Sequence, residues 1–390
     1  MRKRYLETIV EEDLETKMVF IGGPRQVGKT TLAQAVASRL GPAEYLNWDN
    51  PQHKLKIVRQ QWSPLSRCLV FDEIHKYESW KNLIKGIWDT RLQAEKILVT
   101  GSSRLDIYRR SGDSLLGRYH YHTLHPFTLR EYNGLFPTLE MPQSCGRLDF
   151  SRSGAGMSEL MCFGGFPEPL LRASQRALKR WQRERFERVF REDIRSFEQV
   201  RRLSQVELLG ALLPHRVGSP LSLSSLVEDL QATPKTIINW MDVLRRNYYC
   251  FRVMPYHRRL ERALRKEAKY YLWDWSEVEL EGPRFENLVA SHLLKFCDFH
   301  HDSFGLAVEL WYLRDRERRE VDFLVTWEGS PWFMVECKLR PGSTRALQYF
   351  GDRLEVAQRY QVVGTESDPW LDRKTGVLTL PASRFLMALV

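Results

Sequence analysis

The residues whose types and spacing most clearly indicate chemistry form the loop Gly23–Thr30. Its sequence, Gly-Pro-Arg-Gln-Val-Gly-Lys-Thr, fits the pattern G-x-x-x-x-G-K-[ST]. The apolar run Met18–Gly22 before it predicts a strand, and the residues after it predict a helix. Glycines let backbone N–H groups surround an anion, and the dipole of the helix favours negative charge at the same place. We expect Lys29 to reach the β- and γ-phosphates of ATP, and Thr30 to offer its hydroxyl to Mg²⁺. The predicted nucleotide-binding residues are Gly23, Pro24, Arg25, Gln26, Val27, Gly28, Lys29, Thr30 and Thr31.

An acidic pair, Asp72 and Glu73, ends the next strongly apolar run, which starts at Cys68. A buried parallel strand delivers such acids to the carboxyl edge of its sheet, beside the phosphates. We expect Asp72 to hold the Mg²⁺ shell and Glu73 to orient and deprotonate the attacking water. The pair therefore predicts hydrolysis as well as binding.

A third predicted strand, Lys96–Thr100, leads into Ser102, Ser103 and Arg104. A hydroxyl here would bond the γ-phosphate or position the lytic water. The segment Glu44–Asp49 reads as another strand that ends in an acid. Strands that alternate with helices in this way predict a mostly parallel sheet covered by helices.

Two C-terminal segments carry a second set of chemical groups. Glu320 and Asp322 share one face of a predicted strand, Glu336 and Lys338 share a face of the next, and the Gly-Ser-Pro between them predicts a hairpin. Two carboxylates can hold Mg²⁺, and an adjacent lysine can activate water. Glu286, on a predicted helix, would add a third acid. Solvated charges on half-buried strands, or a site that binds without cleaving, remain open alternatives.

The middle of the chain predicts a winged helix over residues 206–256. Thr233 is a predicted N-cap with Pro234 in the first turn, and Ile237, Ile238, Trp240, Met241 and Leu244 are expected to face the core. Outward residues of such a helix, and the arginines beyond it, can meet DNA, although the same fold also serves as a packing module. The predicted DNA-binding residues are Lys235, Asn239, Arg245, Arg246, Arg258 and Arg259.

Several motifs in order resemble the prokaryotic AAA-type ATPases that carry a C-terminal domain of nuclease-like fold. They are the loop at 23–32, Asn-Trp-Asp at 47–49, Phe-Asp-Glu-Ile-His-Lys at 71–76, Thr-Gly-Ser-Ser at 100–103, Ser-Leu-Leu-Gly-Arg at 114–118, His-Pro-Phe-Thr-Leu-Arg-Glu at 125–131 and Phe-Gly-Gly-Phe-Pro-Glu at 163–168. The resemblance implies an AAA+ module in which Arg118 or Arg104 neutralises charge on the γ-phosphate, across a subunit boundary in an oligomer. It also implies a PD-(D/E)-x-K core with Glu286, Asp322, Glu336 and Lys338 at its active positions.

Length and composition fit this organisation. The 390 residues are too many for one typical core, and 43% apolar with 28% charged residues is the balance of a soluble protein. We predict an α/β chain with a P-loop AAA+ domain at 1–150, a helical region with the winged helix at 151–282, and the nuclease-like domain at 283–390. No apolar stretch is long enough to cross a bilayer, and six scattered cysteines favour the cytoplasm.

A net charge of +10 makes a polyanion a plausible partner. The sequence predicts an ATP-hydrolysing motor, with ATP and Mg²⁺ as cofactors, that remodels duplex or branched DNA as a homo-oligomer, of which a hexameric ring is one form. Metal-dependent DNA cleavage is a further option. The alternative is a nucleotide-switched scaffold whose nuclease-like domain only binds a partner. A metabolite kinase fits the arginine-rich middle region less well.

Overall fold

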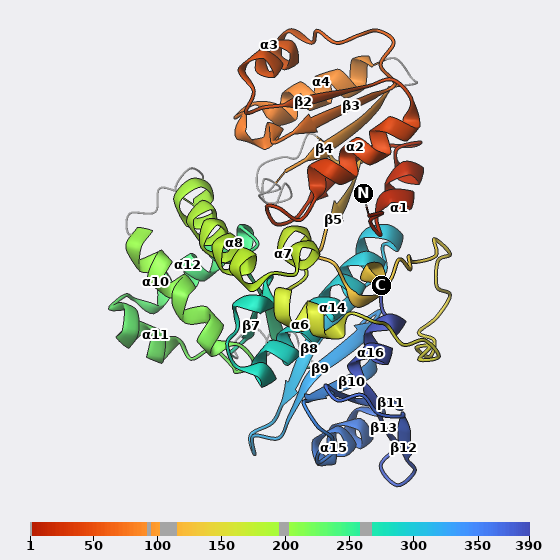
Figure 1. Cartoon of the computed structure of the whole chain (residues 1–390), viewed down its shortest axis with the longest axis vertical. Helices are drawn as coiled ribbons and strands as arrows, with labels where there is room; N and C mark the ends of the chain where they lie inside the picture. The colour runs from red at the N-terminus through yellow and green to blue at the C-terminus, as the bar shows by residue number, and fades with distance from the viewer. Residues whose placement is uncertain (1, 92–94, 102–114, 195–202, 258–266) are drawn as a thin grey trace. The chain divides into compact units, whose positions relative to one another are not determined.

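The computed structural model describes residues 2–91, 95–101, 115–194, 203–257 and 267–390. The chain divides by its contacts into two compact units, Met1–His125 and Pro126–Val390 (Figure 1). This division lies earlier than the boundary predicted near residue 150. The reason is that the segment after Pro126 is bonded into the C-terminal half: Leu129 N donates to His292 Nε2 at 3.0 Å, and Thr128 Oγ1 donates to the Val390 carbonyl at 3.0 Å.

The first unit is built on a sheet of five strands in the order β2-β3-β4-β1-β5, and each described pairing is parallel. The strands are β1 (Met18–Gly22), β2 (Ala43–Asn47), β3 (Cys68–Asp72), β4 (Lys96–Thr100) and β5 (Tyr119–Thr123). Every residue of β1 and β3 is buried, as expected for central strands covered on both faces. The parallel sheet predicted from the sequence is confirmed.

Helices cover this sheet. They are α1 (Glu7–Asp13), α2 (Lys29–Leu40), α3 (Pro51–Arg59) and α4 (Trp80–Thr90), with a 3-10 turn η1 (Ile74–Lys76). Alternate residues of the central strands, such as Phe20 and Phe71, pack with Trp80 and Ile84 of α4 in one apolar core. Because α2 begins where β1 ends, the carboxyl edge of the sheet carries the candidate nucleotide site.

The second unit contains an eight-stranded mixed sheet in the order β12-β13-β11-β10-β9-β8-β6-β7. Its strands are β6 (Cys250–Pro255), β7 (Lys269–Leu272), β8 (Val308–Arg314), β9 (Glu320–Trp327), β10 (Ser330–Lys338), β11 (Gln358–Val363), β12 (Trp370–Asp372) and β13 (Val377–Pro381). The predicted hairpin is present, since β9 and β10 pair antiparallel with Trp327 opposite Ser330. Its two turn residues, Glu328 and Gly329, both have positive φ, as tight hairpin turns require.

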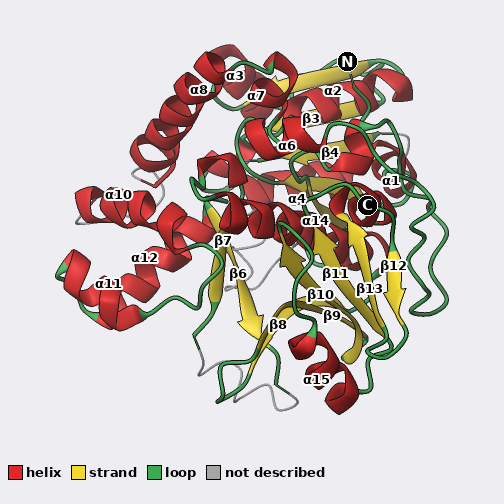
Figure 2. Cartoon of the chain, turned by 60° about the horizontal axis from the view of Figure 1, so that its bottom comes forward, coloured by secondary structure: helices red, strands yellow, loops and turns green. Residues whose placement is uncertain are grey.

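Helices lie on both faces of this sheet (Figure 2). Phe333 of β10 packs against Phe296 of α14 (Glu281–Phe304), whereas its neighbour Met334 packs with Leu347 of α15 (Arg345–Leu354). Successive side chains of a strand point to opposite faces, so α14 and α15 cover opposite sides. The other helical segments are α5 (Leu129–Tyr132), α6 (Met157–Phe163), α7 (Pro167–Arg172), α8 (Gln175–Glu187), η3 (Arg188–Ile194), η4 (Leu213–Arg216), η5 (Trp275–Glu277), α16 (Ala382–Phe385) and η6 (Leu386–Ala388).

Three helices and a hairpin follow one another in the region predicted as a winged helix. They are α10 (Leu203–Leu212), α11 (Leu223–Leu230), α12 (Pro234–Arg246) and the antiparallel pair β6–β7. Thr233 caps α12 as predicted, accepting a bond from Thr236 N at 3.2 Å. Ile238 was expected in the core but is 46% exposed, because Val243 fills the buried face of α12 instead. The hairpin also joins the large sheet, since β6 pairs with β8, so the winged-helix interpretation stays a prediction.

None of the helices in the described ranges is both long enough and apolar enough to span a bilayer.

Candidate functional site

The phosphate loop connects β1 to α2, and both of its glycines have backbone conformations that residues with a side chain rarely adopt. Gly23 has φ +142°, and a Cβ placed there would lie 2.5 Å from the Leu124 carbonyl oxygen. Gly28 caps α2 with φ +101°. The Lys29 ammonium donates to the carbonyls of Gly23 at 2.9 Å and Pro24 at 2.8 Å, which holds it across the loop. A phosphate chain fits such a cradle, because the backbone can approach it without side-chain obstruction.

Asp72 ends β3 and is fixed by three hydroxyl groups. Thr30 Oγ1 donates to Asp72 Oδ2 at 2.8 Å, Tyr45 OH donates to the same oxygen at 2.5 Å, and Thr100 Oγ1 donates to Oδ1 at 2.5 Å. Burial and the bond to Asp72 raise the pKa of Tyr45 to about 12, so the phenol remains a donor at neutral pH. Thr30 and Asp72 are therefore adjacent, as their predicted Mg²⁺ role requires. Mg²⁺ commonly takes one or two protein ligands and completes its shell with phosphates and water, so these residues fit it.

Glu73 follows Asp72 with φ +56°, a left-handed conformation that is strained for a residue with a side chain. Its N–H donates to the Thr100 carbonyl at 3.0 Å, and its carboxylate lies 3.5 Å from Lys76 Nζ and 3.7 Å from His75 Nε2. Burial would raise the pKa of Glu73, but positive charge at His75, Lys29 and Lys76 brings it below its ordinary value. Burial lowers the pKa of His75 to about 4, so at pH 7 the lysines supply that charge.

Of the four residues predicted to act on the γ-phosphate or the lytic water after β4, the structure describes only Arg118. Ser102, Ser103 and Arg104 lie outside the described residues. Arg118 comes just before β5, whose first residue pairs with Met18 at the start of β1, and it forms an ion pair with Asp89 at 2.9 Å. The phosphate loop begins at the other end of β1, about 16 Å away for a five-residue strand. Arg118 therefore cannot serve the nucleotide held by its own chain in this arrangement.

Three contributors to this site were missed from the sequence. Thr100 and Tyr45 lie on the strands that flank β3, where the register places Thr100 opposite Asp72. The Arg4 guanidinium donates to the Val27 carbonyl at 2.6 Å and thereby supports the loop. Only Thr100 carried a usable signal, because it is the last residue of the third predicted strand.

The acidic cluster of the second unit is organised around a lysine that sequence reasoning also missed. Lys269 Nζ, fully buried, lies 2.6 Å from Glu320 Oε1, 3.1 Å from Glu286 Oε1 and 3.5 Å from Asp322 Oδ1. Burial lowers the pKa of Lys269, but Glu286, Asp322 and Glu320 outweigh it and raise the pKa above its usual range. Burial, followed by the Asp322 charge, raises the pKa of Glu286 to about 7.

Glu336 and Lys338 form a separate pair at 3.3 Å, while Asp322 Oδ2 accepts the Cys337 N–H at 2.8 Å. Across the described ranges, His, Cys, Asp and Glu side chains make no group of three or more suited to a metal ion. The single ammonium of Lys269 partly neutralises Glu286, Glu320 and Asp322 but does not contact Glu336. The Mg²⁺ role of Asp322 and Glu336 therefore stays a prediction, and we derive no step through a metal there.

The predicted DNA-binding residues differ in exposure. They are Lys235, Asn239, Arg245, Arg246, Arg258 and Arg259. The first two are exposed on α12, next to the exposed Ile238. Arg245 and Arg246 are half-buried, and Arg245 pairs with Asp242 at 2.8 Å. The last two lie outside the described residues.

Comparison with protein families agrees with the geometry of the first unit. Residues 15–133 match the family model of an AAA domain. This match supports a P-loop ATPase. Residues 155–276 and 281–383 match two domains of unknown function, DUF8612 and DUF4143. A nuclease-like fold for the last of these is therefore not confirmed.

The chain is also similar to uncharacterized proteins along most of its length. One from Methanocaldococcus jannaschii is 23% identical over 433 residues, covering 99% of this chain and 87% of the relative. One from Mycobacterium tuberculosis is 21% identical over 388 residues, covering 95% of this chain and 81% of the relative. Among solved structures, a Walker-type ATPase of Pyrococcus abyssi shares 16% identity with a TM-score of 0.41, covering 71% of this chain and 95% of that one.

Proposed function

We propose that this chain hydrolyses ATP with Mg²⁺ at the loop Gly23–Thr30 and couples hydrolysis to the remodelling of duplex or branched DNA. The observation that carries the ATPase part is the contact of 2.8 Å between Thr30 Oγ1 and Asp72, with Glu73 next in the chain. It joins the phosphate loop to the acidic strand end through the two groups that hold Mg²⁺ in P-loop enzymes.

The chemical roles follow from position. Lys29 and the loop N–H groups stabilise the charge that builds up on the phosphate oxygens. Mg²⁺, when bound by Thr30 and Asp72, neutralises the same phosphates. Glu73 accepts the proton of the attacking water, and its lowered pKa keeps it ionised at neutral pH.

The nucleic-acid part rests on charge. The net charge of +10 favours a polyanion, and exposed Lys235 and Asn239 give α12 a surface able to meet a DNA backbone or groove. DNA cleavage is not part of the proposal, because three of the acids, Glu286, Glu320 and Asp322, are bonded to the buried ammonium of Lys269.

Phosphate release measured with and without duplex or junction DNA tests this coupling. We expect the rate to rise several-fold with DNA, and DNA binding to weaken steeply with salt as counterions are released. Equal rates with DNA, with RNA and without nucleic acid would favour the alternative, a nucleotide-switched scaffold.

The location of Arg118 makes assembly part of the proposal. Arg118 lies at the end of the sheet opposite the phosphate loop. It can therefore reach the γ-phosphate only of a nucleotide bound to a second copy of the chain, as in a ring. Mass measurement with a non-hydrolysable ATP analogue should then detect an oligomer. A monomer with and without the analogue would remove Arg118 from the mechanism.

A further inference from the structure

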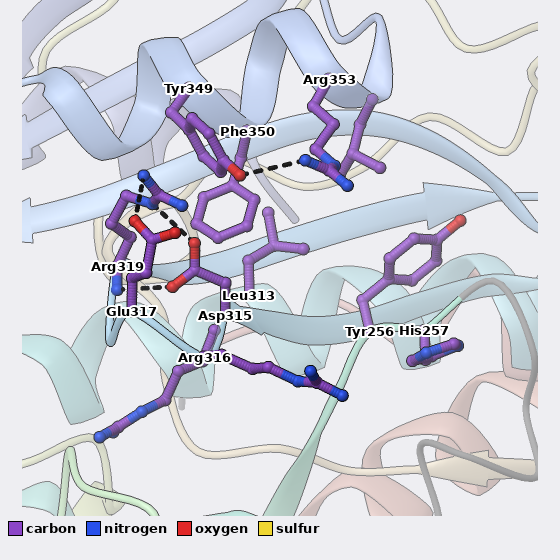
Figure 3. Close-up of a pocket in the computed structure, with 12 residues that line it drawn as sticks. Tyr256, His257, Leu313, Asp315, Arg316, Glu317, Arg319, Tyr349, Phe350 and Arg353 are labelled. Atoms are coloured by element: carbon purple, nitrogen blue, oxygen red, sulfur yellow. Dashed lines mark hydrogen bonds and ion pairs between the residues drawn. The ribbon is translucent and has the colours of Figure 1, made fainter.

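A pocket of about 580 Å³ opens in the second unit (Figure 3). Tyr349, Phe350 and Arg353 of α15 line one side, and Tyr256 and His257, which follow β6, line the other. The loop between β8 and β9 closes the remaining side with Asp315, Arg316, Glu317 and Arg319. The volume of the pocket is within the range of roughly 300–1,000 Å³ that is typical of small-molecule sites.

The two acids of this pocket share one arginine. Arg319 bonds Asp315 at 2.6 Å and Glu317 at 2.8 Å, and its guanidinium lies 3.7 Å from the centre of the Tyr349 ring. These contacts fix the loop against α15 and balance one of the two acidic charges. The four arginines that line the pocket outnumber its two acids, which favours an anion.

Two further arginines supply charge that is not balanced in this way. Arg316 and Arg353 are exposed, and within the described part of the chain neither forms an ion pair. Arg353 donates to the Tyr349 hydroxyl at 3.1 Å, which orients its guanidinium at the pocket. Tyr256 is half-buried, and its backbone N–H donates to the Tyr312 carbonyl at 2.8 Å. Its ring contacts Trp311 edge to face, so the ring is positioned before any ligand binds.

We propose that this pocket binds one nucleotide of a single-stranded nucleic acid. The base stacks on Tyr256 while Arg353 and Arg316 hold the adjoining phosphates. Aromatic rings combined with arginines are the usual means by which proteins hold single strands without reading their sequence. The inference rests on the proposed function, since a strand separated from duplex or branched DNA would provide this ligand.

The test is fluorescence anisotropy of the full chain, without ATP, using a labelled oligothymidylate. Alanine substitution of a stacking residue costs about 1–3 kcal/mol per base, so Tyr256→Ala should weaken binding about 5- to 150-fold, and Tyr256→Phe should restore it. Arg353→Ala should weaken binding and reduce the slope of log K against log salt by about 0.7, the value for one phosphate contact on a single strand. Arg345→Ala is the matched control, because Arg345 is exposed on α15 but does not line the pocket.

Unchanged affinity in Tyr256→Ala and Arg353→Ala would overturn the inference, even if duplex DNA still stimulated hydrolysis. Competition by free thymidine monophosphate as strong as by the oligonucleotide would also overturn it, and would identify the pocket as a site for a small nucleotide. Pocket-dependent binding of the strand, with ATP hydrolysis indifferent to DNA, would leave the inference intact and reject the proposed function.

Discussion

Glu73→Gln is expected to lower ATP turnover by about 10²- to 10⁴-fold, because the amide cannot accept the proton of the attacking water. ATP binding should remain, since Lys29, Thr30 and Asp72, the residues proposed to hold the phosphates and Mg²⁺, are unchanged in this variant. Phosphate release and equilibrium ATP binding, measured on the same preparation, separate the two effects.

Glu78→Gln is the matched control for this variant. Glu78 is exposed five positions along the chain, and we expect its amide variant to turn over ATP at the wild-type rate. If Glu73→Gln also kept that rate, Glu73 would not be the base, and another group would have to activate the water.

Lys269→Ala is expected to destabilise the second unit by about 3–5 kcal/mol, the usual cost of removing one partner from a buried ion cluster. Without the ammonium, Glu286, Glu320 and Asp322 would face one another in a buried site. Urea unfolding followed by tryptophan fluorescence should show a lower midpoint. The exposed Lys374, changed to alanine, should leave the midpoint where it is.

The same variant tests the role of the acidic cluster. If the cluster holds a metal rather than Lys269, added Mg²⁺ or Mn²⁺ should restore the stability of Lys269→Ala, and the wild type should nick DNA in a manner that Asp322→Asn abolishes. Either result would contradict our account of the cluster.

The sequence predicted the nucleotide site well because its residues are close together in the chain. The loop and the acidic pair each have a recognisable pattern, and the rule that parallel strands end at one edge brings them together. Tyr45 and Arg4 could not be predicted, since their roles depend on strand register and on a contact across 23 residues.

The second unit was predicted less completely. The β9–β10 hairpin follows from its turn residues, but Lys269 belongs to a run of basic residues in which no pattern distinguishes the one that becomes buried. Helical periodicity placed most of the buried face of α12, yet it misassigned Ile238, because that residue lies at the boundary of the apolar stripe. The pocket between α15 and the β8–β9 loop joins distant segments and left no local signal.

Equilibrium binding of ATP to the wild type and to Lys29→Ala tests the central claim most directly. We expect the wild type to bind ATP in the presence of Mg²⁺, and Lys29→Ala, which lacks the ammonium that spans the loop, to lose most of this affinity. Equal affinity in the two proteins, or no ATP binding by the wild type, would contradict a nucleotide site at Gly23–Thr30.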